Sequence, residues 1–92
     1  MTADRRSELP SITELVDVVV QACQSLGGPA TSREIDVEAI AALRIDTDLQ
    51  AIPHQVGQKR SEISYRLAWA RTRAKAEGRL VRRDDSRWSS QI

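Results

Sequence analysis

The sequence contains few of the residues that most metal and small-molecule sites require. Of its 92 residues one is cysteine, one is histidine and none is phenylalanine. One cysteine cannot form an internal disulfide, and Cys23 with His54 falls short of the three or four ligands of a zinc site. Cys23 lies among apolar residues at helical spacing, where we expect a buried, inert thiol. The sequence therefore predicts no metal, no cofactor and no cysteine catalysis.

Long hydrophobic runs and targeting signals are also missing. No apolar run approaches the roughly 20 residues of a membrane span, and the charged residues 1–10 lack the apolar centre of a secretory signal. These absences predict a cytoplasmic protein with no membrane partner. A chain of this length forms one small domain with a thin core, which favours a binding module over an enzyme with an enclosed cavity.

The charge is divided unevenly along the chain. Residues 1–57 hold four arginines against nine acidic residues, a net charge of −5, whereas residues 58–92 hold ten lysines or arginines against four acidic residues, a net charge of +6. A basic half of this kind indicates a polyanionic partner, although a solvated surface helix would also be basic. The acidic residues Glu34, Asp36 and Glu38 are interpreted as a solvated helix face.

Capping signals and apolar periodicity predict the first two helices. We interpret residues 1–10 as a flexible lead-in and residues 11–90 as the domain. Ser11 and Glu14 form a capping box before a helix that extends to Leu26, where Gly27-Gly28-Pro29 ends it. Thr31 and Glu34 repeat this signature before a second helix that ends near Leu43 or Arg44.

A third helix and a hairpin follow the connector of residues 45–60, which is expected to contain one short helical turn near residues 48–52. Apolar residues at i, i+4, i+7 and i+11 predict a helix over residues 61–77 with one buried face. Leu80-Val81 and Trp88 then flank the turn residues Asp84-Asp85-Ser86, which predicts two strands. The fold class is mostly α with a small β-hairpin, in the order of a winged helix-turn-helix.

The third helix and the hairpin are the candidate site. Short polar side chains on a helix can approach base edges in the major groove, while lysine and arginine neutralise phosphates. We predict that double-stranded DNA is bound by the first turn of the helix, by its exposed side and by the hairpin. The residues concerned are Lys59, Arg60, Ser61, Ser64, Tyr65, Arg71, Lys75, Arg82, Arg83 and Arg87.

The remaining aromatic residues leave alternatives open. Trp69 and Trp88 could stack on a flipped base, but packing of the hairpin against the third helix is the preferred interpretation for both. Tyr65 either faces solvent near DNA or forms a surface pair with Arg66. His54 either donates to a backbone carbonyl and fixes the connector, which is preferred, or contacts a phosphate.

The third helix also carries a family resemblance. The run SEISYRLAWART, from Ser61 to Thr72, is preceded by HQVGQKR and followed by a tryptophan ten residues after Gly78. It resembles the N-terminal winged-helix domain of Mrr-type restriction endonucleases. The stretch LPSITELVDVVVQACQSLGG is similar to the opening helix of that family, so the resemblance covers nearly all of residues 9 to 90.

This resemblance implies a winged-helix fold and DNA recognition for a restriction system, often one directed at modified DNA. In that family a separate C-terminal nuclease domain with a D/E-x-K motif cuts the DNA, and no such motif precedes Lys59 or Lys75. We therefore expect a reader without enzymatic activity, associated with a C-terminal or separate nuclease domain. The alternative is a protein–protein interaction or dimerisation module, with the acidic first two helices as its contact surface.

Overall fold

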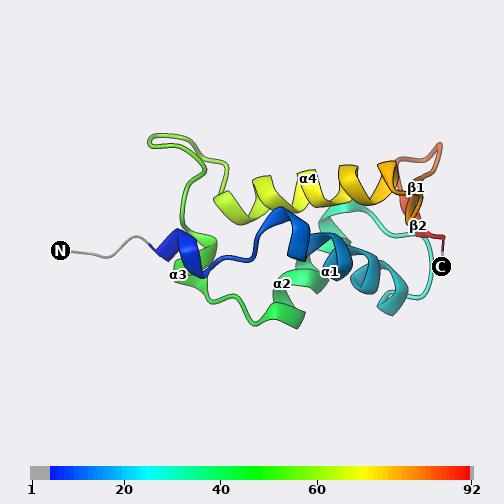
Figure 1. Cartoon of the computed structure of the whole chain (residues 1–92), viewed down its shortest axis with the longest axis horizontal. Coiled ribbons are helices and arrows are strands. Elements are labelled where there is room, and N and C mark those ends of the chain that lie inside the picture. The colour runs from blue at the N-terminus through cyan, green and yellow to red at the C-terminus, as the bar shows by residue number, and fades with distance from the viewer. Residues whose placement is uncertain (1–4, 92) are drawn as a thin grey trace.

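The computed structural model describes residues 5–91, which form a mostly helical fold with one antiparallel hairpin (Figure 1). A 3-10 helix, Arg5–Glu8, precedes four α-helices, and the hairpin closes the chain. The helices are α1 (Ile12–Ser25), α2 (Ser32–Leu43), α3 (Thr47–Gln50) and α4 (Glu62–Ala76), and the strands are β1 (Leu80–Arg82) and β2 (Trp88–Ser90).

Side-chain caps start the helices where the sequence predicts them. The Ser11 hydroxyl accepts from the backbone N–H of Glu14, and Thr31 with Glu34 forms a complete capping box. Ser61 caps α4 by accepting from the N–H of Ser64. The helix predicted over residues 61–77 is confirmed, because α4 occupies Glu62–Ala76 and Gly78 follows it with a φ of +75°.

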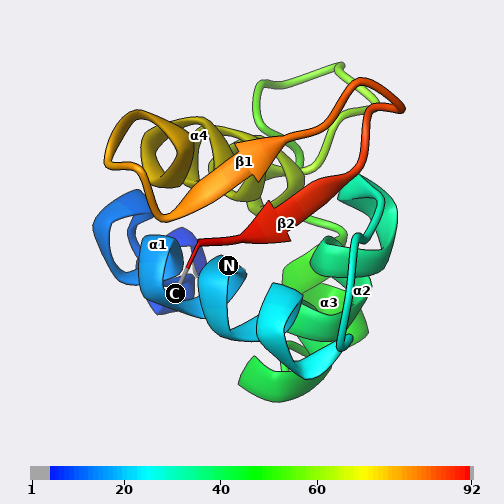
Figure 2. The ribbon, with the colours of Figure 1, turned by 90° about the vertical axis from the view of Figure 1, so that its right-hand side faces the viewer.

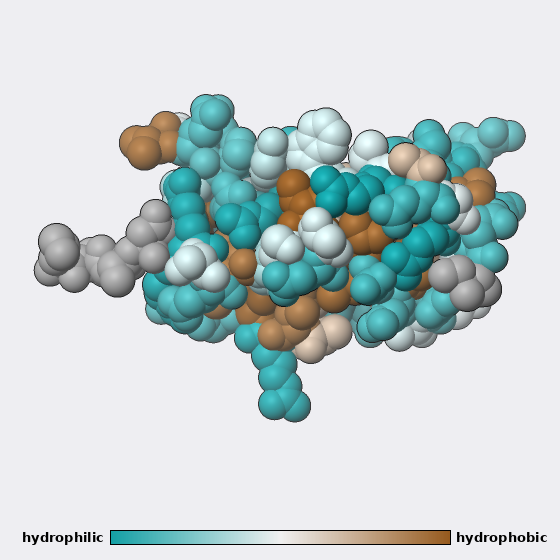
Figure 3. Space-filling model, in the orientation of Figure 1, coloured by the Kyte–Doolittle hydropathy of each residue, from teal (hydrophilic) through white to brown (hydrophobic). Residues whose placement is uncertain are grey.

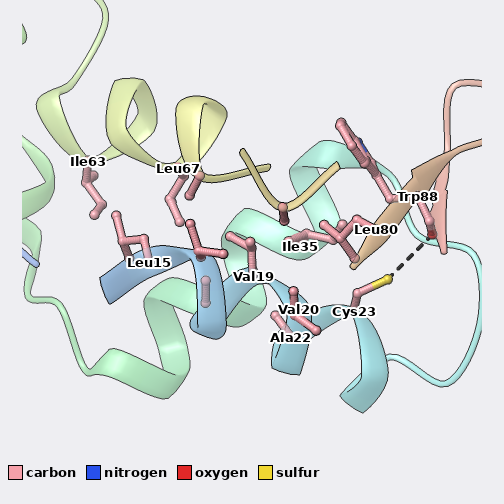
Figure 4. Close-up of a cluster of buried hydrophobic side chains, with 14 of the residues drawn as sticks. Leu15, Val19, Val20, Ala22, Cys23, Ile35, Ile63, Leu67, Leu80 and Trp88 are labelled. Carbon is pink, nitrogen blue, oxygen red and sulfur yellow. Dashed lines mark hydrogen bonds between the residues drawn. The ribbon is translucent and has the colours of Figure 1, made fainter. Parts of the chain in front are cut away.

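The core lies between α1 and α4, with α2 and the hairpin closing it (Figure 4). The four residues predicted for the buried face of the third helix are all at most 1% exposed: Ile63, Leu67, Ala70 and Ala74. In Figure 4, Leu15 and Val19 of α1 point toward the side of α4 that carries Ile63 and Leu67. Cys23 is buried, as predicted, and its Sγ lies 3.5 Å from the Trp88 carbonyl oxygen.

The hairpin crosses the end of the helical layer (Figure 2). β1 pairs with β2 in antiparallel register, Arg82 opposite Trp88, and Trp88 also bridges to Ala30 in the segment between α1 and α2. The two bridge hydrogen bonds measure 2.9 and 2.7 Å, and the Trp88 indole donates to the Ser32 hydroxyl. The predicted packing of Trp88 in the core is therefore confirmed, since this side chain is only 3% exposed.

Several expectations need correction. Residues 5–91 contain four α-helices rather than three, because the Asp46 carboxylate caps the turn after α2 and makes it the separate helix α3. Residues 5–10, expected to be a flexible lead-in, pack on the domain and bury Leu9, while residues 1–4 lie outside the described part. Trp69 is 51% exposed, so its predicted core role is wrong. Leu26, predicted for the buried face of the first helix, is 39% exposed.

Within residues 5–91 no helix combines the length and the apolar character that crossing a membrane requires.

Candidate nucleic-acid interface

The connector between α3 and α4 leads directly into the predicted first contact residues. Pro53 and Ser61 form an isolated antiparallel bridge, and the His54 N–H donates to the Arg60 carbonyl at 2.8 Å. The chain between them therefore leaves and re-enters the domain as a narrow loop, which we name the connector arm (residues 53–60). Lys59 lies on the returning side of this arm and is exposed, as is Arg60.

A buried carboxylate holds the base of the connector arm to α4. Glu62 is 7% exposed, and it accepts hydrogen bonds from Arg66 Nε at 2.7 Å and from His54 Nδ1 at 2.9 Å. Burial raises the pKa of the Glu62 carboxyl, but these hydrogen bonds outweigh burial and set the pKa below its usual value. An ionised carboxylate only accepts, so His54 Nδ1 is the donor. His54 therefore fixes the connector, as preferred, but the acceptor is the Glu62 carboxylate and not the expected backbone carbonyl.

Tyr65 lies against this cluster. Its ring stacks on the His54 ring with centroids 3.6 Å apart, and the Arg60 guanidinium lies 5.7 Å from the Tyr65 centroid. Arg66, expected as a possible surface partner of Tyr65, instead turns to the opposite side and donates to the carbonyls of Leu9 and Pro10. Tyr65 is half-buried, and its outer edge shares the surface of α4 with the half-buried Ser64.

The side of α4 that faces α2 carries Arg71 and Lys75. Arg71 forms a hydrogen-bonded ion pair with Asp36, and its side chain is 11% exposed. Burial raises the pKa of the Asp36 carboxyl, although the positive charges of Arg71 and Arg60 oppose this shift. Two expectations are therefore wrong: Arg71 is not displayed on the exposed side of the helix, and Asp36 is not part of a solvated face. Lys75, one turn further on, is exposed.

The hairpin presents three exposed arginines. The Arg82 guanidinium lies 5.0 Å from the centroid of the buried Trp88 ring, so its stem covers the core while its charge stays at the surface. The N–H of Arg83 donates to the carbonyl of Arg87 and closes the turn, in which Ser86 has a φ of +68°. The turn thereby keeps Arg83 and Arg87 at the projecting end of the hairpin.

Most of the predicted cations are free of intramolecular ion pairs. Of the seven lysines and arginines in the predicted site, only Arg71 has a carboxylate partner among the described residues. Several carboxylates are instead paired with other arginines, as Asp17 is with Arg79. The six that remain available for a polyanion are Lys59, Arg60, Lys75, Arg82, Arg83 and Arg87.

Five of these cations lie near the two ends of α4, and the Arg60 side chain extends from the N-terminal end toward Ala68 and Thr72. The connector arm rises from the N-terminal end of the helix and the hairpin from its C-terminal end (Figure 1), and in the end-on view both project beyond α4 on the same side (Figure 2). Between Ile63 and Ala76 the helix contains no acidic residue. The upper edge of Figure 3, formed by these three segments, is mostly teal and white. The result is a polar ridge flanked by two basic projections.

Trp69 is the surface residue that the sequence interpretation missed. It lies one turn from both Arg66 and Arg73, on the side of α4 where Arg73 donates to the Thr13 hydroxyl of α1. With Arg60, Ala68 and Thr72 it lines a shallow depression of about 280 Å³. The signal was available in the sequence, because Trp69 falls outside the i, i+4, i+7 and i+11 series of the buried face.

The described part of the chain offers no alternative metal or thiol chemistry. Within residues 5–91 no group of three His, Cys, Asp or Glu side chains is placed to hold a metal ion. Burial raises the pKa of the Cys23 thiol, which favours its unreactive protonated form.

Comparison with known proteins identifies no relative: no family model matches the chain, and no curated protein or solved structure matches it significantly. The resemblance to the Mrr-type N-terminal domain stays a prediction.

Proposed function

We propose that this protein is a winged-helix module that binds double-stranded DNA, with α4 as the recognition helix and the β1–β2 hairpin as the wing. The order of elements supports the fold assignment. In particular, the bridge from Ala30 to Trp88 places a one-residue third strand between α1 and α2, at the edge of the hairpin. We extend the proposal to a reader module of an Mrr-like restriction system, without nuclease activity of its own.

The observation that carries the proposal is the set of six unpaired cations at both ends of α4. α4 itself has no acidic residue between Ile63 and Ala76, so a phosphate backbone along this stretch would meet no carboxylate of the helix, and the neighbouring Asp36 is already paired with Arg71. Phosphate contacts from the two ends would position α4, and Ser61, Ser64 and Tyr65 would be left nearest to the base edges. Ser61 already caps the helix, which leaves Ser64 and Tyr65 as the stronger candidates for base contacts.

The salt dependence of duplex binding tests the proposal. If all six cations neutralise phosphates, the log–log slope of affinity against salt is about −5. Replacing Arg83 and Arg87 by glutamine should weaken that slope by about 2, because two counterions fewer are released. Arg44→Gln is the matched control, since Arg44 is an exposed arginine at the C-cap of α2, away from α4 and the hairpin. Absence of duplex binding, or a slope that Arg83 and Arg87 do not change, would refute the proposal.

A second candidate function is protein interaction, and the exposed Trp69 favours it. Tryptophan is enriched among residues that dominate protein interfaces, and Trp69 lies on the α1 side of α4. Under this function Trp69→Ala should lower the mass of an oligomer measured by light scattering. Under DNA binding alone, the mass would stay unchanged and the salt slope would be retained.

A further inference from the structure

The connector arm is fixed more firmly than its irregular backbone suggests. Besides the Pro53–Ser61 bridge, the Arg6 guanidinium donates to the Pro53 carbonyl at 2.7 Å, and the Glu62 N–H donates to the Ile52 carbonyl at 2.7 Å. The stacking of His54 on Tyr65 adds a side-chain contact at the same level. The base of the arm is therefore attached to the N-terminal segment and to the start of α4.

The far end of the arm is open to solvent and carries no charge. Gln55 to Gln58 form a tight turn, with a hydrogen bond from the Gln58 N–H to the Gln55 carbonyl and Gly57 at a φ of +81°. Val56 occupies the outermost position and is 97% exposed, the most exposed of the large hydrophobic residues. The tip thus consists of one apolar side chain between two primary amides, with Lys59 and Arg60 behind it.

The position of the connector arm at one end of α4 determines which part of a DNA duplex it can reach. The 15 residues of α4 extend over about 22 Å, whereas the major groove is about 12 Å wide. When the first turn of such a helix lies at the base edges, the segment that precedes it lies over a bounding phosphate backbone, and so does the segment that follows the far end of the helix. A projection from either helix end therefore reaches past the backbone into the adjoining minor groove. The hairpin occupies the C-terminal end, and the connector arm occupies the N-terminal end (Figure 1).

We propose that the connector arm is a second DNA-reading element, which inserts Gln55, Val56 and Gln58 into the minor groove beside the major groove occupied by α4. This inference rests on the proposed DNA binding. Glutamine is one of the side chains that read the minor groove, and its amide N–H groups match the N3 and O2 acceptors of A·T pairs. Val56 contacts the sugar walls, while Lys59 and Arg60 bind the phosphates at the entrance.

The ligand class follows from this chemistry. A guanine 2-amino group projects into the minor groove, where it blocks the approach of Val56 and puts a donor opposite the N–H₂ groups of the glutamine side chains. The arm therefore prefers duplex in which the minor groove lacks this amino group. Inosine provides a selective probe, because an I·C pair keeps the major-groove pattern of G·C and removes only the minor-groove amino group.

The experiment compares the affinity of the full chain for two duplexes of equal length, one with G·C pairs and one with I·C pairs at the same positions. We expect the unaltered chain to bind the I·C duplex about tenfold more tightly. The combined substitution Gln55→Ala, Val56→Ala and Gln58→Ala should abolish this preference. The control carries Gln21→Ala and Val37→Ala, which remove an exposed glutamine of α1 and an exposed valine of α2 and should keep the preference.

Each outcome has one meaning. Equal affinity of the unaltered chain for the two duplexes refutes minor-groove reading by the connector arm and leaves the proposed DNA binding intact. A preference for the I·C duplex that survives the triple substitution also refutes minor-groove reading by the arm. The same holds if the triple variant binds both duplexes more weakly while the ratio of the two affinities stays the same. Failure of the unaltered chain to bind either duplex overturns the proposed function together with this inference.

Discussion

Replacing Glu62 by glutamine should destabilise the fold at the start of α4. The substitution preserves the size of the side chain and removes its negative charge. Two donors, Arg66 Nε and His54 Nδ1, converge on this carboxylate at 2.7 and 2.9 Å, and the side chain is only 10% exposed. A glutamine offers one acceptor oxygen and turns an amide N–H₂ toward the other donor.

The expected loss follows from those two contacts. A hydrogen bond to a charged group contributes about 1.5–3 kcal/mol, and Glu62→Gln removes at least one such bond and weakens the other. Arg66 keeps its bonds to the Leu9 and Pro10 carbonyls, so its charge is not left without partners. We therefore expect the free energy of unfolding to fall by about 2–3 kcal/mol, which corresponds to a decrease in Tm of about 10–20 °C for a domain of this size.

Thermal unfolding followed by circular dichroism at pH 7 and pH 4 measures the loss of stability in Glu62→Gln and tests whether it comes from the lost negative charge. Because the folded-state pKa of Glu62 is lower than its unfolded value of 4.5, its contribution is complete above that pH and disappears as the pH falls through the folded pKa. The Tm difference between the two proteins should therefore shrink in acid. Glu77→Gln is the control, since Glu77 is an exposed glutamate at the other end of α4 and should change stability by less than about 0.5 kcal/mol.

Two results would refute this reasoning. A Tm for Glu62→Gln within one or two degrees of the unaltered protein would show that the buried charge contributes no net stability. A difference that stays constant from pH 7 to pH 4 would show that the loss comes from packing rather than from ionisation.

Three further predictions concern burial and backbone conformation. Trp88→Ala should cost about 3–5 kcal/mol in chemical denaturation, whereas Trp69→Ala should cost less than about 0.5 kcal/mol and should remove the tryptophan emission that iodide quenches. Cys23, whose thiol pKa is raised by burial, should react with a thiol reagent at neutral pH only as fast as the chain unfolds; rapid reaction of the folded protein would contradict its placement. Gly78→Ala should destabilise the end of α4 by about 1 kcal/mol because of the φ of +75° alone, since no atom lies within 4 Å of the added carbon; an unchanged Tm would argue against that conformation.

Local chemistry made most of the helices predictable. Each N-terminus carries a Ser, Thr or Asp cap with a local partner, and the apolar spacing of α4 identified its buried face correctly. The limits of α2 and the strands around the Asp84–Ser86 turn followed from the same kind of signal. These features depend on neighbours in the chain, so a single sequence contains the information.

Tertiary pairing was the part that the sequence did not reveal. Whether Arg71 faces solvent or a carboxylate depends on where α2 lies, and Asp36 is 35 residues away. In the sequence, Glu62 likewise has the position of an ordinary acidic residue in a first helical turn. Its contact with His54 is visible only in the folded structure. Trp69 was misplaced because large apolar residues are usually buried, although its position on the helix already separated it from the buried series.

The attachment of residues 5–10 has a practical consequence for anyone who shortens this chain. Leu9 fills part of the core, Arg6 holds the Pro53 carbonyl, and the Leu9 and Pro10 carbonyls receive the Arg66 guanidinium. A fragment that begins at the Ser11 cap would retain every α-helix of the described residues and still lose these three sets of contacts. The smallest unit that preserves the geometry around Pro53 therefore starts at or before Arg6.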